Sequence, residues 1–276
     1  MPSVKITVLG WLSMILVPVV AFAGVHSTVP TEAPKYTLYI SDKCPYAQRS
    51  WIAARELGVP FDLHQMELGK DNKEEWYLNI NPLGKVPAVV CGEDVVYESL
   101  VINEYLSDCF PGGDGDPAAS RLLPENPGGR AMARIVAQRS NDLVRAFFTY
   151  LSNKSQKQEA TLRESFEKEI RMLDEYAAKS EKEGGKGWLC GKAGGGCMTL
   201  ADIAYLPFME RIDATLKPFK GWSLDELDTP ALQAWMVQCM SQESVAGTLK
   251  DPSEWAELYK KFLGVEYFVR AGVTDT

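Results

Sequence analysis

The chain has 276 residues, of which 46% are hydrophobic and 24% are charged. This composition is typical of a globular protein with one or two domains. The formal net charge of −8 disfavours a nucleic-acid partner, because a phosphate backbone requires a basic surface. Six cysteines are too few for a disulfide scaffold of this length. With only two histidines beside them, their spacing matches no zinc site, so we expect no metal.

The first 30 residues predict a targeting segment rather than part of the fold. One lysine precedes an apolar run from Ile6 to Ala23, and Ala21-Phe22-Ala23 has the small-residue pattern of a cleavage site. The run is near the lower length limit for a membrane span. A cleaved signal is favoured by Pro18 and the small residues, and an uncleaved membrane anchor is the alternative. The signal would send the chain to the secretory route or to an organelle such as a plastid.

Residues 35–110 alternate between β-rich and helical patterns. The first strand, helix and second strand form a βαβ unit, whose strands pair in parallel through a right-handed crossover. A later hairpin supplies antiparallel strands, so the order predicts a thioredoxin-like α/β domain. The predicted elements are strand 35–41, helix 46–57, strand 61–68, a short helix or turn at 73–80, strands 86–91 and 95–99, and helix 99–110. The first helix has an apolar stripe at Ala47, Trp51, Ala54 and Leu57.

The rest of the chain predicts a second, all-helical domain over residues 129–270, after a Gly- and Pro-rich linker at 111–128. Helical patterns cover 130–151, 161–179, 229–240 and 253–263, and the segment 186–212 contains a further apolar helix. Thr199 to Asp202 form a variant capping box at the start of an apolar helix, and we interpret it as structural. A disulfide between Cys190 and Cys197, which flank a Gly-rich loop, is left open. Core packing is the expected role of Phe147, Phe148 and Tyr150.

Cys44 directly precedes Pro45 at the start of the first predicted helix, where proline is favoured. The free N–H groups and the macrodipole at a helix N-terminus stabilise a thiolate, so we expect the pKa of Cys44 to lie below that of a free thiol. Position 47 holds alanine, so a mixed disulfide at Cys44 would need an external thiol such as glutathione to resolve it. The alternative is a buried thiol that acts as a small hydrophobic side chain. His64 lies within a strand, where we expect an exposed or hydrogen-bonded side chain rather than a base.

Three segments resemble the glutathione transferase superfamily: CPYAQR at 44–49, NPLGKVP at 81–87 and YESLVI at 97–102. The cysteine stands where many members have a catalytic tyrosine or serine. In this respect the chain resembles the omega and lambda classes and, more loosely, the dehydroascorbate reductases. The resemblance covers residues 36–265 and implies a thioredoxin-like domain followed by an all-helical domain.

The resemblance also implies a glutathione site, with glutathione as co-substrate. Val86 and Pro87 would be joined by a cis peptide, and the Val86 backbone would pair with the peptide of glutathione. The remaining implied contacts are Glu98 with the γ-glutamyl ammonium, Ser99 and its helix N-terminus with the γ-glutamyl carboxylate, Lys73 with the glycyl carboxylate, and Tyr46 in the pocket wall. The alternatives are a solvated side chain for Lys73 and a plain helix cap for Glu98 and Ser99.

The implied activity is glutathione-dependent thiol transfer through Cys44, including deglutathionylation and dehydroascorbate reduction. The implied partners are glutathione and a small disulfide, an electrophile or a glutathionylated substrate. One alternative is a conventional conjugating transferase, and another is a non-catalytic binding module on the same fold. Whether the chain is a monomer or a homodimer, and whether its N-terminus tethers it to a membrane, the sequence leaves open.

Overall fold

The computed structural model describes residues 35–111 and 122–263. The predicted targeting segment, residues 1–30, lies outside the described residues, as does part of the predicted linker. Within the two described ranges, no helix is both long and apolar enough to cross a membrane.

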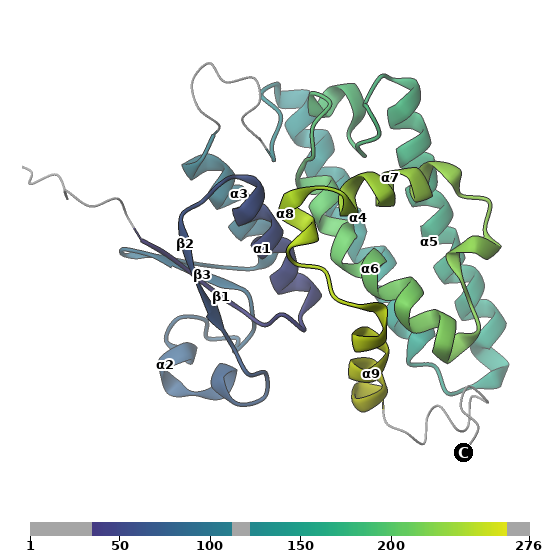
Figure 1. Ribbon diagram of the computed structural model, residues 1–276, viewed down its shortest axis with the longest axis horizontal. Coiled ribbons are helices and arrows are strands. Elements are labelled where there is room, and N and C mark those ends of the chain that lie inside the picture. The colour runs from purple at the N-terminus through teal and green to yellow at the C-terminus, as the bar shows by residue number, and fades with distance from the viewer. Residues whose placement is uncertain (1–34, 112–121, 264–276) are drawn as a thin grey trace, which may run out of the picture. The chain divides into compact units, whose positions relative to one another are not determined.

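Described residues 35–111 form the predicted thioredoxin-like domain (Figure 1). Its elements are β1 (Tyr36–Ile40), α1 (Pro45–Glu56), β2 (Phe61–Gln65), the 3-10 turn η1 (Asp71–Lys73), α2 (Glu75–Leu78), β3 (Ala88–Cys91), β4 (Asp94–Tyr97) and α3 (Ser99–Cys109).

The strands form one mixed sheet in the order β2-β1-β3-β4. The predicted parallel pairing of β1 with β2 is confirmed, and so is the antiparallel hairpin of β3 and β4. Side chains alternate between the two faces of β1. Leu38 and Ile40 are buried on the face that α1 and α3 cover, whereas Tyr39 packs against Tyr77 of α2, with ring centroids 5.8 Å apart.

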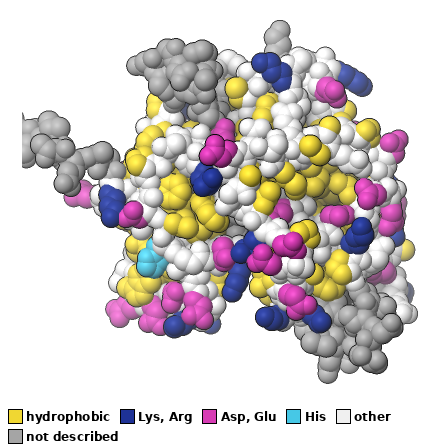
Figure 2. Space-filling model, in the orientation of Figure 1, with side chains coloured by type: hydrophobic (Ala, Val, Ile, Leu, Met, Phe, Trp, Pro, Cys, Tyr) yellow, Lys and Arg dark blue, Asp and Glu magenta, His cyan; other side chains and the backbone are white. Residues whose placement is uncertain are grey.

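The second domain is helical throughout its described residues. Its elements are α4 (Pro127–Leu151), α5 (Gln156–Lys182), the 3-10 turn η2 (Gly191–Gly194), α6 (Leu200–Lys220), the 3-10 turn η3 (Leu224–Glu226), α7 (Pro230–Met240), α8 (Glu243–Ala246) and α9 (Pro252–Leu263). The short helix α8 has no counterpart among the predicted elements. On the face seen in Figure 2, Lys and Arg side chains are scattered among Asp and Glu rather than gathered in a stripe.

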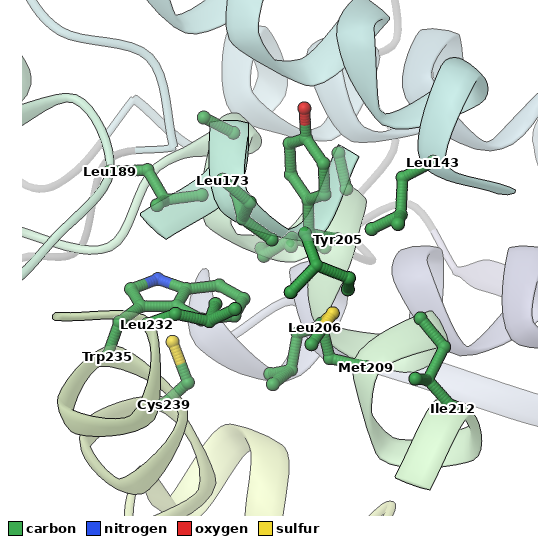
Figure 3. Close-up of a cluster of buried hydrophobic side chains, with 14 of the residues drawn as sticks. Leu143, Leu173, Leu189, Tyr205, Leu206, Met209, Ile212, Leu232, Trp235 and Cys239 are labelled. Carbon is green, nitrogen blue, oxygen red and sulfur yellow. The ribbon is translucent and has the colours of Figure 1, made fainter. Parts of the chain in front are cut away.

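The core of the helical domain forms around α6, whose side chains are buried over most of its length. Figure 3 shows Tyr205, Leu206, Met209 and Ile212 of α6 among side chains from the neighbouring helices α4, α5 and α7. The expected core role of Phe147 and Tyr150 is confirmed, because both are almost fully buried. The neighbouring Phe148 is half-buried instead, and its ring stacks on Tyr259 with centroids 6.3 Å apart.

The capping box predicted at Thr199 and Asp202 is present at the start of α6. The buried carboxylate of Asp202 accepts hydrogen bonds from the Thr199 and Leu189 backbone N–H groups, at 2.8 and 2.9 Å, and from the Trp235 indole at 2.9 Å. Burial raises the pKa of Asp202, and these donors oppose that effect. Cys190, in the adjacent loop, is buried and Cys197 is exposed, and both thiols are free in the structure.

Helix α1 is more deeply enclosed than the predicted apolar stripe indicated. Ala47 and Ala54 are buried as expected, but Trp51 and Leu57 are only half-buried. Three polar side chains on the same helix are at most 2% exposed, namely Gln48, Arg49 and Ser50. The reason is that α1 packs against the sheet on one side and against α6 on another. The apolar stripe of α1 predicts the face that packs on the sheet. It does not predict the polar face that is buried on other helices.

Candidate functional site

Cys44 lies at the N-cap position of α1, directly after the turn that follows β1. Its Sγ atom is 3.9 Å from the backbone carbonyl oxygen of Val86. Pro45 occupies the first turn of the helix, where a missing N–H costs no hydrogen bond. The fold therefore brings the first two quoted segments, 44–49 and 81–87, together at the half-buried thiol.

Val86 and Pro87 are joined by a cis peptide bond, as the resemblance implied. Both residues line a cavity of about 310 Å³, which is near the lower limit for small-molecule sites. No hydrogen bond within the described residues uses the Val86 N–H. The other residues that line the cavity are Tyr46, Asn81, Lys85, Glu98 and Ser99.

Glu98 and Ser99 form the end of the cavity at the N-terminus of α3. Glu98 is the N-cap residue and has a φ angle of 70°, which is rare for a residue other than glycine and often marks a functional site. Its side chain is exposed, whereas Ser99 is 6% exposed. The free N–H groups of the helix and the Ser99 hydroxyl suit a carboxylate. The Glu98 carboxylate suits an ammonium group beside it.

Tyr46 lines the cavity and also contacts the helical domain. Its ring lies edge-on to Phe208 of α6, with centroids 5.1 Å apart. Burial is the main reason that the pKa of the Tyr46 hydroxyl lies above its ordinary value. The hydroxyl is therefore protonated at neutral pH and can donate a hydrogen bond into the cavity.

The pKa of the Cys44 thiol departs from the sequence expectation. Burial raises this pKa above its ordinary value, and the helix does not reverse the effect. The backbone N–H groups of Ala47 and Tyr46 lower the pKa, as do the more distant guanidinium groups of Arg211 and Arg49. Neither N–H makes a hydrogen bond of normal geometry to Sγ. The expectation considered only the helix end and left out the cost of desolvating a thiolate.

Arg49 is a buried cation directly behind the cavity. It is 1% exposed, and its guanidinium donates to the Ala204 carbonyl oxygen at 2.9 and 2.6 Å and to the Ser140 hydroxyl at 2.9 Å. A longer contact of 3.5 Å reaches the Ser99 hydroxyl. Burial lowers the pKa of Arg49 to about 10, so the side chain is still charged at neutral pH. Its hydrogen-bond partners within the described residues are all neutral.

Arg211 of α6 is a second buried cation, and its electrostatic influence reaches Cys44. Its guanidinium carbon lies 3.7 Å from the centre of the Trp255 ring, a cation–π contact. Nη1 donates to the Gln48 side chain at 2.6 Å. Nε and Nη2 have no hydrogen-bond partner within the described residues. The charge is compensated by Glu210, whose carboxylate oxygen lies 3.5 Å from Nη1, but the two unpaired nitrogen atoms are a cost in a buried group.

Comparison with known proteins gives the same assignment for both halves of the chain. Residues 43–109 match the family model "Glutathione S-transferase, N-terminal domain", and residues 142–243 match "Glutathione S-transferase, C-terminal domain". The chain belongs to the glutathione S-transferase family.

Individual relatives connect this glutathione S-transferase with several classes. It is 28% identical over 225 residues to Arabidopsis thaliana glutathione S-transferase L3, covering 81% of this chain and 86% of the relative. It is 25% identical over 236 residues to Sus scrofa glutathione S-transferase omega-1, covering 84% and 88%. It superposes on the crystal structure of rice GST1 in complex with glutathione with a TM-score of 0.69 and 27% identity, covering 86% and 97%. The transferase is therefore related to lambda and omega enzymes.

Five predicted site residues of this transferase line the cavity: Tyr46, Val86, Pro87, Glu98 and Ser99. Cys44 does not line it, but its Sγ lies 3.9 Å from the Val86 carbonyl oxygen. Lys73 ends η1, is exposed, and is not among the residues that line the cavity. Lys85 and Asn81 line it instead. Both lie in the NPLGKVP segment, so the sequence indicated this loop as part of the site. It did not indicate Asn81 or Lys85 as site residues.

Other titratable residues lie away from the cavity wall. The exposed ring of His64 packs against Tyr39 and Trp76, with centroids 5.0 and 5.6 Å away. This agrees with the expectation of an exposed strand histidine. In the described part of the transferase, no group of three or more His, Cys, Asp or Glu side chains could hold a metal ion. The two buried arginines were not predicted, because nothing in the sequence distinguishes them from surface arginines.

Proposed function

We propose that this glutathione S-transferase is a glutathione-dependent thiol transferase in which Cys44 is the nucleophile. The observation that carries the proposal is the position of the Cys44 thiol, at a helix N-terminus and 3.9 Å from the Val86 carbonyl oxygen at the cavity wall. The cavity offers a backbone N–H, a helix N-terminus and a carboxylate to a peptide-like ligand with both charges. The rice relative named above was crystallised with glutathione, which supports the same ligand here.

The proposed reaction starts from a mixed disulfide between glutathione and a substrate thiol. The Cys44 thiolate attacks the glutathione sulfur, a new disulfide forms at Cys44, and the substrate leaves as a thiolate that takes up a proton. A second glutathione, as thiolate, then attacks the glutathione sulfur bound to Cys44. This step releases glutathione disulfide and regenerates the Cys44 thiolate.

The raised pKa of Cys44 is compatible with this reaction. A thiol with a higher pKa is ionised to a smaller extent, but its thiolate is the stronger nucleophile. The positive charges of Arg211 and Arg49 oppose the desolvation cost when the thiolate forms.

The alternative activity is conjugation of glutathione to an electrophile. A hydroxyl at position 44 would stabilise the thiolate of bound glutathione, whereas a thiol tends to form a disulfide with it. The two activities therefore respond in opposite ways to Cys44→Ser. A non-catalytic binding module would show neither activity.

The test compares the full-length wild type with Cys44→Ser and with Cys197→Ser, a matched change at an exposed thiol. Reduction of hydroxyethyl disulfide by glutathione is measured for each, together with intact mass. We expect activity and a glutathione adduct on Cys44 in the wild type and in Cys197→Ser, and neither in Cys44→Ser. Conjugation of chlorodinitrobenzene that persists or rises in Cys44→Ser, without disulfide reduction in the wild type, would favour the alternative.

A further inference from the structure

A second pair of cysteines lies at the end of the sheet opposite the catalytic thiol. Cys44 follows the C-terminal end of β1, whereas Tyr36 begins that strand. Cys91, the last residue of β3, is the cross-strand partner of Tyr36. The length of a five-residue strand separates the two ends by roughly 13 Å. Cys91 is therefore no part of the Cys44 site.

Helix α3 brings Cys109 to the same corner of the sheet. Phe110, which follows Cys109, packs its ring edge-on against Tyr36, with centroids 5.3 Å apart. Tyr105 is one helical turn before Cys109 and donates a hydrogen bond of 2.8 Å to Asp94. Asp94 is in turn the cross-strand partner of Cys91. The ring contact with Tyr36 and the hydrogen bond to Asp94 thus fix the C-terminal end of α3 beside β1, β3 and β4.

The Tyr36 side chain lies beside both cysteines. The side chains of both Cys109 and Cys91 interact with it. The two thiols therefore share one neighbour, the Tyr36 hydroxyl. Their exposure differs, since Cys109 is exposed and Cys91 is 8% exposed. Both thiols are free in the structure.

We propose that Cys91 and Cys109 form a second redox site, which small disulfides such as glutathione disulfide oxidise to an intrachain disulfide. The strand register, the Tyr36–Phe110 ring contact and the Tyr105–Asp94 hydrogen bond place the two cysteines together. This inference does not depend on the proposed function of Cys44.

The chemistry needs glutathione disulfide as the only oxidant. The exposed Cys109, as thiolate, attacks one sulfur of glutathione disulfide, forms a mixed disulfide and releases one glutathione, which takes up a proton. The Cys91 thiolate then attacks the Cys109 sulfur, breaks its bond to glutathione and releases the second glutathione. Two protein thiols lose two electrons and two protons in total, and glutathione disulfide gains both. Cys109 reacts first because it is the accessible thiol of the two.

The test uses the full chain carrying Cys44→Ser, so that the catalytic cysteine cannot form an adduct. The protein is equilibrated in buffers with a rising share of glutathione disulfide, quenched with acid and alkylated in denaturant. Intact mass and peptide mapping then follow. We expect a species that carries two fewer alkyl groups than the reduced chain, with a disulfide-linked peptide that joins Cys91 and Cys109. We expect the species to disappear in Cys44→Ser/Cys109→Ser and to persist in Cys44→Ser/Cys197→Ser.

Three results would overturn the proposal. One is full alkylation of Cys91 and Cys109 at every glutathione ratio. Another is a glutathione adduct that persists on Cys109 while Cys91 is still alkylated. The third is a disulfide that joins either cysteine to a different partner. Because Cys109 is exposed, its replacement by serine leaves the fold intact, and circular dichroism of each variant checks this.

Discussion

The guanidinium of Arg49 on α1 donates two hydrogen bonds to the carbonyl oxygen of Ala204 on α6, at 2.9 and 2.6 Å. Ala204 lies one turn of α6 before Phe208, whose ring also faces the Arg49 guanidinium, 4.8 Å from its carbon. The helix that begins after Cys44 is therefore fixed to the helical domain by a charged, fully enclosed contact. A planar fork of donors suits this role better than a single ammonium group.

Replacing Arg49 by methionine should destabilise the transferase strongly. The change removes hydrogen bonds from a charged donor to the Ala204 carbonyl and the Ser140 hydroxyl, which contribute about 1.5–3 kcal/mol each. Ser140 keeps its hydrogen bond to the Ala137 carbonyl. Denaturant unfolding measures the loss. The matched control is Arg134→Met, since Arg134 is 43% exposed and pairs with Glu104 at the surface. Its loss should stay below about 1 kcal/mol. Equal losses for the two variants would contradict the interpretation.

Replacing Ser99 by alanine should weaken glutathione binding. A hydroxyl that donates to a carboxylate contributes about 1.5–3 kcal/mol, so we expect the KM for glutathione to rise roughly ten-fold or more. Ser107→Ala on the same helix is the control, because the buried Ser107 hydroxyl has no partner within the described residues. That change should leave KM unaltered and leave stability equal or slightly higher. A KM for Ser99→Ala within two-fold of wild type would remove Ser99 from the site.

The pH dependence of Cys44 alkylation follows from its raised pKa. Because burial disfavours the thiolate, iodoacetamide should react with Cys44 along a curve whose apparent pKa lies above the ordinary value of 9.0. A raised pKa in the folded state also means that stability decreases as pH rises through it. Alkylation of the native chain, resolved by peptide mass, gives the curve, and the urea-unfolded chain gives the reference. An apparent pKa in the native chain below the reference would support the helix-end expectation instead.

Replacing Arg211 by methionine should raise the pKa of Cys44 further. Arg211 lowers this pKa through its positive charge, and methionine keeps much of the apolar bulk against Trp255. We therefore expect slower alkylation of Cys44 at a fixed pH near 8. Arg145→Met is the control, because Arg145 is 76% exposed on α4. If both variants alkylate at the wild-type rate, the charge of Arg211 does not act on the thiol.

Replacing Glu167 by glutamine should cost stability at neutral pH and much less in acid. Burial raises the pKa of Glu167, but hydrogen bonds from Arg163, Arg171 and Trp222 outweigh it and lower the pKa below 4.5. A lowered pKa gives stability that is complete above the unfolded-state value and is lost as pH falls through the folded-state value. Unfolding at pH 7 should show a loss of about 1.5–3 kcal/mol, and the difference from wild type should shrink near pH 3. Glu183→Gln, at an exposed pair with Lys179, should show almost none.

The elements with a clear period or turn signal could be predicted from sequence. The β-rich run before Cys44, the proline at the start of α1 and the capping box before α6 each depend on neighbours in the chain, and the structure has them where the sequence predicts. The cavity beside Cys44 could not be predicted from local patterns alone. Its residues were indicated by the resemblance of three separated segments to the transferase family. The tertiary surroundings of individual side chains could not be predicted from the sequence. Arg49 becomes buried because α6 packs against α1, and Arg211 becomes buried between α1 and Trp255 of α9.

Helix α1 packs against the sheet on one side and against α6 on another, which limits how the two domains can be separated or exchanged. The interface between the two domains contains Gln48 and Arg49, which bond to Glu210 and Ala204 of α6. A fragment ending in the linker would therefore expose a polar surface shaped for α6 rather than for solvent. Exchange of the helical half for that of a relative must therefore supply a carbonyl oxygen and a hydroxyl at the positions of Ala204 and Ser140. In a chimera that lacks these two acceptors, the Arg49 guanidinium would be buried without its hydrogen-bond partners. A chimera of this fold therefore has to preserve these hydrogen bonds, and joining two sequences in the linker is not enough.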